Sequence, residues 1–292
     1  MDLSARPWRS VLYIPGSKPR ALEKARALAT DAIIFDLEDA VAVDEKPAAR
    51  RLLADTLIEG GYGARALMVR INALDTDWGS DDVAGIARAR PQAVLLPKVN
   101  SPTDIEELAR RLDARAETAE TRIWAMMETP EGVLNAAAIA RAPRMAGFIL
   151  GTNDLAKDLG ARFRPDRLPL MGALQTCLLA ARAAGLVAVD GVYNAFRDAE
   201  GLRAECQQGR DLGFDGKTLI HPDQLAVANE VFAPSEAEVE LARRQIAVFD
   251  AARAAGQGVA VLDGRIVENL HVATARATLA KARAIAQLSV PQ

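Results

Sequence analysis

Residues 32–40 have the sequence Ala-Ile-Ile-Phe-Asp-Leu-Glu-Asp-Ala, in which an apolar run leads directly into acidic side chains. A short continuous run of branched and aromatic residues predicts a strand that is buried on both faces. A helix-like segment follows over residues 47–57, and strands that alternate with helices are typical of a parallel sheet. The stretch therefore predicts one strand–helix unit of an α/β fold.

The same pattern recurs along most of the chain. Eight apolar runs are expected to form strands, at residues 10–14, 32–35, 66–71, 93–96, 123–127, 147–150, 187–189 and 217–220. Most are followed by helix-like segments, at residues 20–29, 47–57, 104–112, 130–140, 168–184 and 197–208. Eight such repeats within about 230 residues fit a closed (β/α)8 TIM barrel better than an open doubly wound sheet.

The last part of the chain has a different pattern. Ser235, with Glu238 three residues later, is typical of a helix start, and a helix is expected over residues 235–255. Asp263-Gly264 predicts a hairpin within residues 259–267, and a final helix is expected over residues 271–286. We expect a barrel with the active site over residues 1–222. Residues 223–292 are expected to form a C-terminal helical and hairpin arm, either a lid that contacts a neighbouring subunit or a packing appendage.

The composition narrows the kind of protein further. The 292 residues are 50% hydrophobic and 26% charged, with a formal net charge of −3, which provides enough apolar material for a full core. No basic block stands out, so neither nucleic acid nor an anionic membrane is expected as the main partner. The amino-terminal residues contain no long apolar run, and we expect a soluble, cytoplasmic protein.

Cysteine and histidine are scarce, which limits the possible chemistry. The cysteines are Cys177 and Cys206, too few for a disulfide scaffold or a cysteine-rich metal site. The histidines are His221 and His271, which leave little material for a histidine-built zinc site or a Ser-His-Asp triad. The chemistry is therefore expected to depend on carboxylates, lysine, arginine or a hard metal ion.

Acidic residues follow several of the expected strands, and the carboxyl ends of barrel strands form the active-site face. The acids expected on this rim are Asp36, Glu38, Asp39, Glu128, Asp154 and Asp190. Carboxylates that lie so near to each other repel one another, and a divalent cation that binds their oxygens relieves the repulsion. Mg²⁺ is the expected cofactor, and Glu128 with Asp154 is the best ligand pair. The alternative is that each acid caps the helix that follows it.

Basic side chains are expected on the same rim. Arg70 ends a strand and could clasp a carboxylate or stabilise an enolate oxygen, or could form an internal salt bridge with Asp36 or Glu38. Lys18 follows the first strand and could bind an anion together with backbone N–H groups. His221 at the last strand end is as consistent with a backbone hydrogen bond as with catalysis.

Seven short segments, in the same order along the chain, resemble the citrate lyase β-subunit/malyl-CoA lyase group. They are RSVLYIPGS (9–17), FDLEDAV (35–41), VRIN (69–72), LPKV (96–99), METPEG (127–132), GTNDL (151–155) and IHPDQ (220–224). The resemblance implies a Mg²⁺-dependent (β/α)8 lyase that forms homotrimers or hexamers. It also implies retro-Claisen cleavage of a 3-hydroxy-3-carboxyacyl-CoA thioester, such as citramalyl-CoA or malyl-CoA, to acetyl- or propionyl-CoA and a keto acid.

The resemblance also implies roles for individual residues. Glu128 and Asp154 match the metal ligands, and Arg70 matches the arginine that grips the substrate and polarises its thioester or enolate oxygen. Asp36 and Asp39 match acids that orient metal-bound waters. The positions that match contacts to the CoA ester are Tyr13, Ile14, Lys18, Lys24, Asn153, Ile220 and His221.

The C-terminal arm departs from the pattern of the group. Malyl-CoA lyases carry an aspartate in the arm, whereas the matching phrase at residues 264–268 ends in Glu268. Glu268 is expected to serve as the base, with one more methylene than the aspartate. The alternatives to a CoA-ester lyase are the citryl-acyl-carrier lyase subunit of a citrate lyase complex, a malyl-CoA thioesterase, a hydroxy-acid aldolase and a non-catalytic barrel protein.

Overall fold

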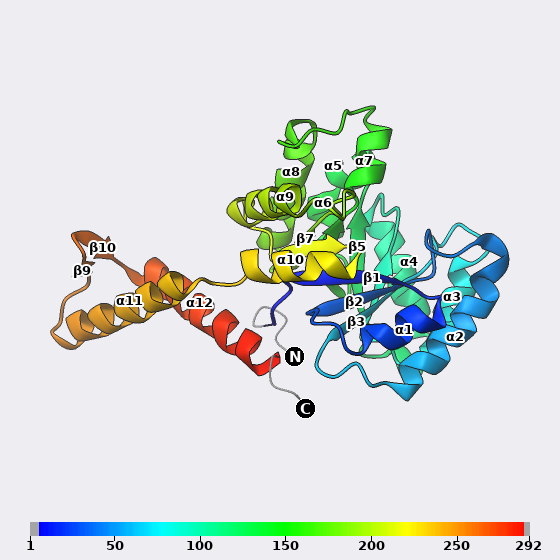
Figure 1. Cartoon of the computed structure of the whole chain (residues 1–292), viewed down its shortest axis with the longest axis horizontal. Helices are drawn as coiled ribbons and strands as arrows, with labels where there is room; N and C mark the ends of the chain where they lie inside the picture. The colour runs from blue at the N-terminus through cyan, green and yellow to red at the C-terminus, as the bar shows by residue number, and fades with distance from the viewer. Residues whose placement is uncertain (1–5, 289–292) are drawn as a thin grey trace. The chain divides into compact units, whose positions relative to one another are not determined.

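Eight parallel strands form a closed barrel in the computed structural model, which describes residues 6–288 (Figure 1). The strands are β1 Ser10–Pro15, β2 Ala32–Asp36, β3 Ala66–Arg70, β4 Ala93–Leu96, β5 Arg122–Met127, β6 Met145–Leu150, β7 Val187–Asp190 and β8 Gly216–Leu219. Each strand pairs with the next in the sequence, and β8 pairs with β1. The expected (β/α)8 barrel is confirmed.

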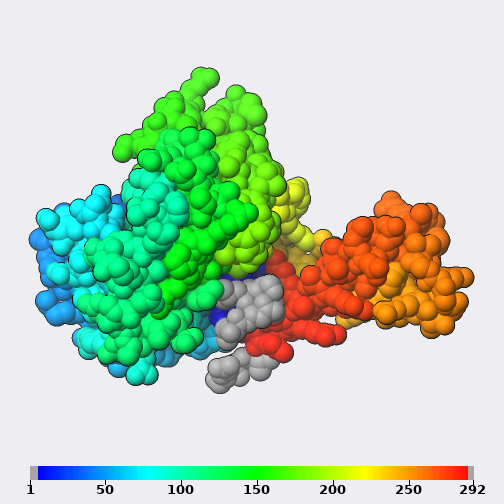
Figure 2. Space-filling model, turned by 180° about the vertical axis from the view of Figure 1, so that it is seen from behind, coloured from blue at the N-terminus to red at the C-terminus, as the bar shows by residue number. Residues whose placement is uncertain are grey.

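Helices surround the barrel, since nearly every strand residue is buried and needs apolar cover on its outer side. They are α1 Pro19–Ala25, α2 Lys46–Glu59, α3 Gly79–Ala87, α4 Pro102–Asp113, α5 Pro130–Leu134, α6 Ala136–Ile139, α7 Thr152–Asp158, α8 Met171–Ala183, α9 Ala199–Leu212 and α10 Leu225–Val231. From behind, the segments coloured cyan to green cover the barrel with their side chains (Figure 2).

The helix expected over residues 130–140 is divided into α5 and α6. Asn135 lies between them with φ −94° and ψ 4°, outside the helical region, and its side-chain amide donates to the Asn100 carbonyl oxygen at 2.8 Å. This side-chain hydrogen bond competes with the helical pattern, as is common for asparagine. Helices α3 and α7 were not among the expected elements, although both pack against the barrel.

The barrel closes where β8 meets β1, with Ser10 opposite Lys217 and Val11 opposite Thr218. Gly216 makes this approach possible, because a Cβ there would overlap the carbonyl oxygen of Trp8. Lys217 is fully buried, and its Nζ donates to Asp190 Oδ2 at 3.1 Å. The seam between the first and last strands therefore depends on a side-chain-free residue, and the buried ion pair joins β8 to its other neighbour, β7.

The remaining described residues form a second compact unit of helices and a hairpin. It contains α11 Glu236–Ala254, the antiparallel pair β9 Ala260–Leu262 and β10 Arg265–Val267, and α12 Asn269–Leu288. Phe249, Ala260, Val267 and Val272 form its own small core. The expected helices and Asp-Gly hairpin are therefore present. No helix in residues 6–288 is both long and apolar enough to span a membrane.

The division between the two units falls after Phe232, whereas the sequence predicts it after residue 222. The reason is α10, which packs against α9 and β1. Its buried residues Leu225, Ala228 and Val231, together with Phe232, belong to the core of the barrel. The first helix after β8 is thus a part of the barrel and not of the arm.

Candidate active site

A pocket of about 260 Å³ opens at the carboxyl ends of the barrel strands. It is lined by Tyr13, Asp39, Arg70, Met126, Glu128, Leu150, Gly151, Thr152, Asn153, Asp154, Val192 and Ile220. These residues come from the ends of β1, β3, β5 and β6 and from the segments after β2, β6, β7 and β8. Seven of the thirteen residues predicted for the site therefore line one cavity.

The two expected metal ligands lie next to each other in this pocket. Glu128 follows β5 and has a side chain that is 1% exposed, whereas Asp154 lies in the first turn of α7. Gly151 packs directly against Glu128, where a Cβ would overlap the carboxylate-bearing side chain. This close approach brings the ends of β5 and β6 together and so sets the separation of the two carboxylates.

Lys98 connects the two carboxylates. Its backbone N–H donates to Glu128 Oε1 at 2.8 Å, and its Nζ lies 3.5 Å from the same oxygen. The same Nζ also donates to Asp154 Oδ2. One residue at the end of β4 thus contacts both acids.

Burial and charge shift the pKa values of Glu128, Asp154 and Lys98 in different directions. Burial raises the pKa of Glu128 to about 8, against the lowering effect of Lys98. Burial would also raise the pKa of Asp154, but hydrogen bonds from Lys98 and Glu128 outweigh it and lower the pKa. The acids in turn raise the pKa of Lys98, despite its partial burial. A buried carboxyl with a raised pKa beside an ionised one is typical of a functional site.

Arg70 is held by a second group of acids. Its Nε and Nη2 donate to the two oxygens of Asp36 at 2.7 and 2.6 Å. Its Nη1 lies 2.7 Å from Glu38 Oε2 and 3.5 Å from Asp39 Oδ2. The internal salt bridge considered from the sequence is therefore present, and the edge of the guanidinium that carries Nη1 faces the pocket-lining residues Asp39 and Met126.

This second group also contains one acid with a shifted pKa and a buried phenol. Burial raises the pKa of Glu38 to about 7, although Arg70 opposes the shift. Burial also raises the pKa of Tyr13, whose ring lies 5.0 Å from the Arg70 guanidinium carbon. The Tyr13 hydroxyl is buried and makes no hydrogen bond, so it is available to a ligand in the pocket. The site as a whole has five carboxylates, which Arg70 and Lys98 neutralise only in part.

The chemistry of Glu128 and Asp154 fits a magnesium ion. Mg²⁺ keeps several waters and takes one or two carboxylates together with substrate oxygens. No cluster of three or more metal-binding side chains occurs within residues 6–288. A site with only two protein carboxylates suits Mg²⁺ and not a structural zinc ion, which takes four protein ligands.

Several residues predicted for the site lie outside the pocket. The side chain of Ile14 is 5% exposed and packs in the hydrophobic core. Lys18 is solvent-exposed and pairs with Glu45, and Lys24 is an exposed residue of α1. His221 accepts a hydrogen bond from the Asp223 N–H at its Nδ1 and stacks on Phe196, which matches the backbone-bonded alternative.

Asp36 and Asp190 also differ from their expected positions on the rim, whereas Glu268 lies in the C-terminal unit, where the sequence predicts it. Asp36 is buried behind Arg70, as the hydrogen bonds above require. Asp190 is fully buried and pairs with Arg167 and Lys217, so it does not line the pocket. Glu268 belongs to the second unit, where its backbone N–H donates to His271 Nδ1 at 3.1 Å.

Sequence reasoning placed Glu38 on the rim and beside Arg70, but it missed that Lys98 contacts both Glu128 and Asp154. Lys98 and Glu38 were both visible as polar residues after expected strands, Lys98 in the phrase Leu-Pro-Lys and Glu38 in Asp-Leu-Glu-Asp. Their signal was their position at strand ends, the same signal that identified Glu128 and Asp154. Their partners lie on other strands, and only the closed barrel places them side by side.

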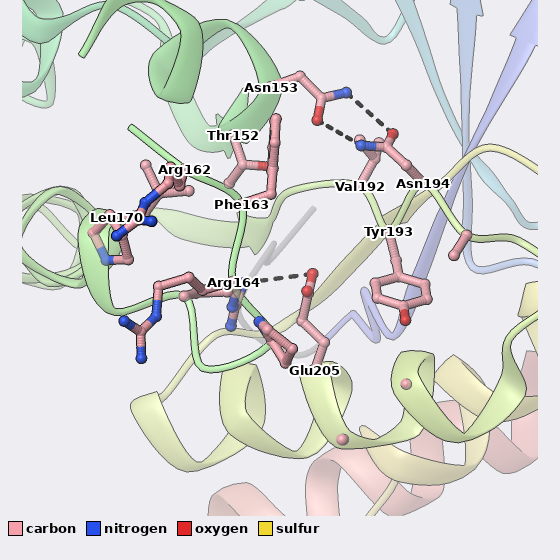
Figure 3. A pocket seen from close by; sticks show the side chains of 16 residues that line it. Thr152, Asn153, Arg162, Phe163, Arg164, Leu170, Val192, Tyr193, Asn194 and Glu205 are labelled. Carbon is pink, nitrogen blue, oxygen red and sulfur yellow. Dashed lines mark hydrogen bonds and ion pairs between the residues drawn. The ribbon is translucent and has the colours of Figure 1, made fainter. Parts of the chain in front are cut away.

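A second, larger cavity of about 470 Å³ adjoins the pocket and shares Thr152, Asn153 and Val192 with it. Asn153 and Asn194 face each other and exchange two hydrogen bonds at its edge (Figure 3). Arg167 lies against Glu205 in this cavity, and both belong to the ion network of Asp190 and Lys217. In that network the positive charges of Arg167 and Lys217 balance the negative charges of Asp190 and Glu205. We therefore assign these residues of the cavity wall a role in stability and not in ligand binding.

Comparison with known proteins identifies the family of this barrel. Residues 9–222 match the model of the HpcH/HpaI aldolase/citrate lyase family. The chain belongs to this family. The HpcH/HpaI aldolase/citrate lyase family is catalytic.

Individual relatives within the family are similar over nearly the whole chain. The (3S)-malyl-CoA thioesterase of Cereibacter sphaeroides strain KD131 is 64% identical over 286 residues, 98% of each chain. The citrate lyase subunit beta of Leuconostoc mesenteroides subsp. cremoris is 37% identical, over 94% of this chain and 93% of its own. The solved structure of Mycobacterium tuberculosis CitE in complex with magnesium, acetoacetate and coenzyme A has a TM-score of 0.79 and 33% identity, over 96% of this chain and 99% of its own.

Proposed function

We propose that this protein is a magnesium-dependent enzyme that hydrolyses the thioester of (3S)-malyl-CoA. The supporting observation is the 64% identity to a (3S)-malyl-CoA thioesterase over 98% of both chains. The site has the chemistry that such a substrate needs, with a carboxylate pair for a cation and an arginine beside it. The product would be malate and free coenzyme A.

Several side chains in and behind the pocket have the following roles in this proposal. Glu128 and Asp154 hold the magnesium ion, which would stabilise negative charge on the oxygens of the bound acid. Arg70, whose Nη1 edge faces the pocket, would donate to the thioester oxygen, where negative charge develops as water adds to the carbonyl carbon. Asp36 fixes the Arg70 guanidinium from behind, and Asp39 at the rim orients water. Tyr13, Asn153 and Ile220 contact the CoA ester from the other sides of the pocket.

A carbon–carbon lyase is the second candidate. It is favoured by the similarity to citrate lyase subunit beta and by the solved CitE structure with magnesium and coenzyme A. In this reaction a base removes the substrate hydroxyl proton and the carbon–carbon bond breaks to release the keto acid. Arg70 stabilises the resulting CoA enolate, which then takes up a proton to give acetyl-CoA. Glu268 is our candidate for the base. We also propose that the arm contacts a neighbouring subunit in a homotrimer or hexamer, which would bring Glu268 to that subunit's pocket.

Product analysis separates the two candidates. Purified protein is incubated with (3S)-malyl-CoA and Mg²⁺, and free thiol and keto acid are measured separately. Thiol without keto acid supports the thioesterase, whereas keto acid without thiol identifies a lyase. If neither product forms with malyl-CoA, citramalyl-CoA and citryl-CoA, the proposed function is wrong.

The metal site is tested by two substitutions. We predict that Glu128→Ala and Asp154→Ala each abolish Mg²⁺-dependent turnover, because each removes one of the two carboxylates that would hold the ion. Turnover is measured at several Mg²⁺ concentrations, and circular dichroism checks the fold. The control is Asp55→Ala, which removes an exposed carboxylate on α2. Normal turnover in both pocket variants would contradict the assignment of the metal ligands.

A further inference from the structure

Lys98 holds the carboxylate pair with both its backbone and its side chain. Its φ of 53° lies in the left-handed region, which is uncommon for a residue with a side chain and marks a constrained position. In this conformation the backbone N–H donates to Glu128 Oε1, and Nζ reaches both Glu128 and Asp154. The ammonium therefore lies between the oxygens that a metal ion would use.

We propose that the Lys98 ammonium is a built-in substitute for the metal ion, which a divalent cation has to displace in order to bind Glu128 and Asp154. The inference rests on the proposed magnesium site and adds a residue that controls its occupancy. Lys98 is a positioning residue in this scheme: it orients the carboxylates before the metal arrives and lowers their affinity for it.

The geometry allows the ammonium to leave without disturbing Glu128. The hydrogen bond from the Lys98 backbone to Glu128 Oε1 does not depend on the side chain and remains when Nζ moves away. The Lys98 side chain is 40% exposed, so its flexible stem has room to swing toward solvent or into the pocket. Glu128, which is 1% exposed, has no such freedom and stays in place as a ligand.

Displacement leaves a positive charge beside a bound cation. Two like charges at close range repel, and this repulsion weakens metal binding until a negative charge arrives. An acidic ligand in the pocket supplies that charge, because its carboxylate can pair with the displaced ammonium. Metal and acid should therefore strengthen the binding of each other, and by the same factor.

The test is the affinity for Mn²⁺, measured by electron paramagnetic resonance or calorimetry without substrate. Lys98→Met keeps the length of the side chain and removes its charge, whereas Lys98→Arg keeps the charge. We expect Lys98→Met to bind Mn²⁺ about tenfold more tightly, because one contacting charge shifts such equilibria by about one to three powers of ten. Lys98→Arg should show no tightening. Equal affinity in wild type and Lys98→Met, or tightening in both variants, would overturn the inference.

A second measurement tests the coupling, with L-malate as the acidic probe. Malate should tighten Mn²⁺ binding in the wild type and do so several-fold less in Lys98→Met, since the variant has no displaced charge to neutralise. The same gain in both proteins would overturn this part of the inference. Glu128→Ala tests the metal site separately from the role of Lys98. If this variant binds Mn²⁺ as well as the wild type, the proposed metal site is wrong, independently of the results for the Lys98 variants.

Discussion

Lys217 carries a buried positive charge between β8 and α9, where its Nζ pairs with Asp190 at 3.1 Å and Glu205 at 2.6 Å. We predict that Lys217→Met lowers the free energy of unfolding by about 3–5 kcal/mol, because it leaves buried acids short of one counter-charge. Urea denaturation measures the change. The control is Arg203→Met, which breaks an exposed ion pair and should leave the midpoint unchanged. Equal stabilities would show that Arg167 alone neutralises the network.

The two cysteines are predicted to be unreactive in the folded protein. Burial raises the pKa of both Cys177 and Cys206 to about 12, so almost no thiolate exists at pH 8. The thiolate is the reactive form, and its fraction increases only as the pH approaches 12. Reaction with a disulfide reagent such as DTNB should be slow in buffer at pH 8 and fast in denaturant. A rapid reaction of either thiol in the native protein would contradict this prediction.

The sequence predicts some side chains of the site better than others. Glu128, Asp154, Arg70 and Asp39 could be placed in the pocket because each lies at or near the end of an apolar strand. Lys98 could not be placed as their partner, since its contacts depend on which strand ends lie opposite one another around a closed ring. The direction of an individual side chain, as for the buried Ile14, is equally invisible in a strand pattern.

The first turn of α11 carries a complete capping box. Ser235 Oγ accepts from the Glu238 N–H at 3.2 Å, and Glu238 Oε2 accepts from the Ser235 N–H at 2.7 Å. We predict that Ser235→Ala costs the second unit about 1 kcal/mol, because the Glu238 backbone N–H loses its side-chain acceptor at an exposed helix end. Hydrogen exchange at the start of α11 measures the loss. The control Thr274→Ala, within α12, should leave this protection unaltered.

Strands and helix starts could be predicted because their signals are local. All eight strand positions were found from apolar runs, and Ser235 with Glu238 correctly marked the start of α11. The break at Asn135 could not be predicted, because it depends on a hydrogen bond to Asn100 in a loop that is distant in sequence. The assignment of α10 to the barrel depends in the same way on its contact with α9.

At the scale of the whole barrel, closure depends on Gly216. We predict that Gly216→Ala destabilises the protein by about 1–3 kcal/mol. The new Cβ would overlap the backbone of Trp8, and both segments are held in place by strand pairing. Thermal unfolding measures the effect. The matched control is Gly172→Ala in α8, where a Cβ meets open space. If both variants unfold at the wild-type temperature, the seam is more adaptable than its geometry indicates.

The pairing of β1 with β8 has a consequence for synthesis on the ribosome. Translation proceeds from the amino terminus, so β1 emerges early, yet one of its two neighbours is the last strand of the ring. Until Leu219 has emerged, one edge of β1 has no strand beside it, and the ends of the strands cannot form a complete rim. Residues 233–292 are translated after that point, which leaves a length of chain to span the exit tunnel while the ring closes. The barrel can thus assemble its pocket before the nascent chain is released.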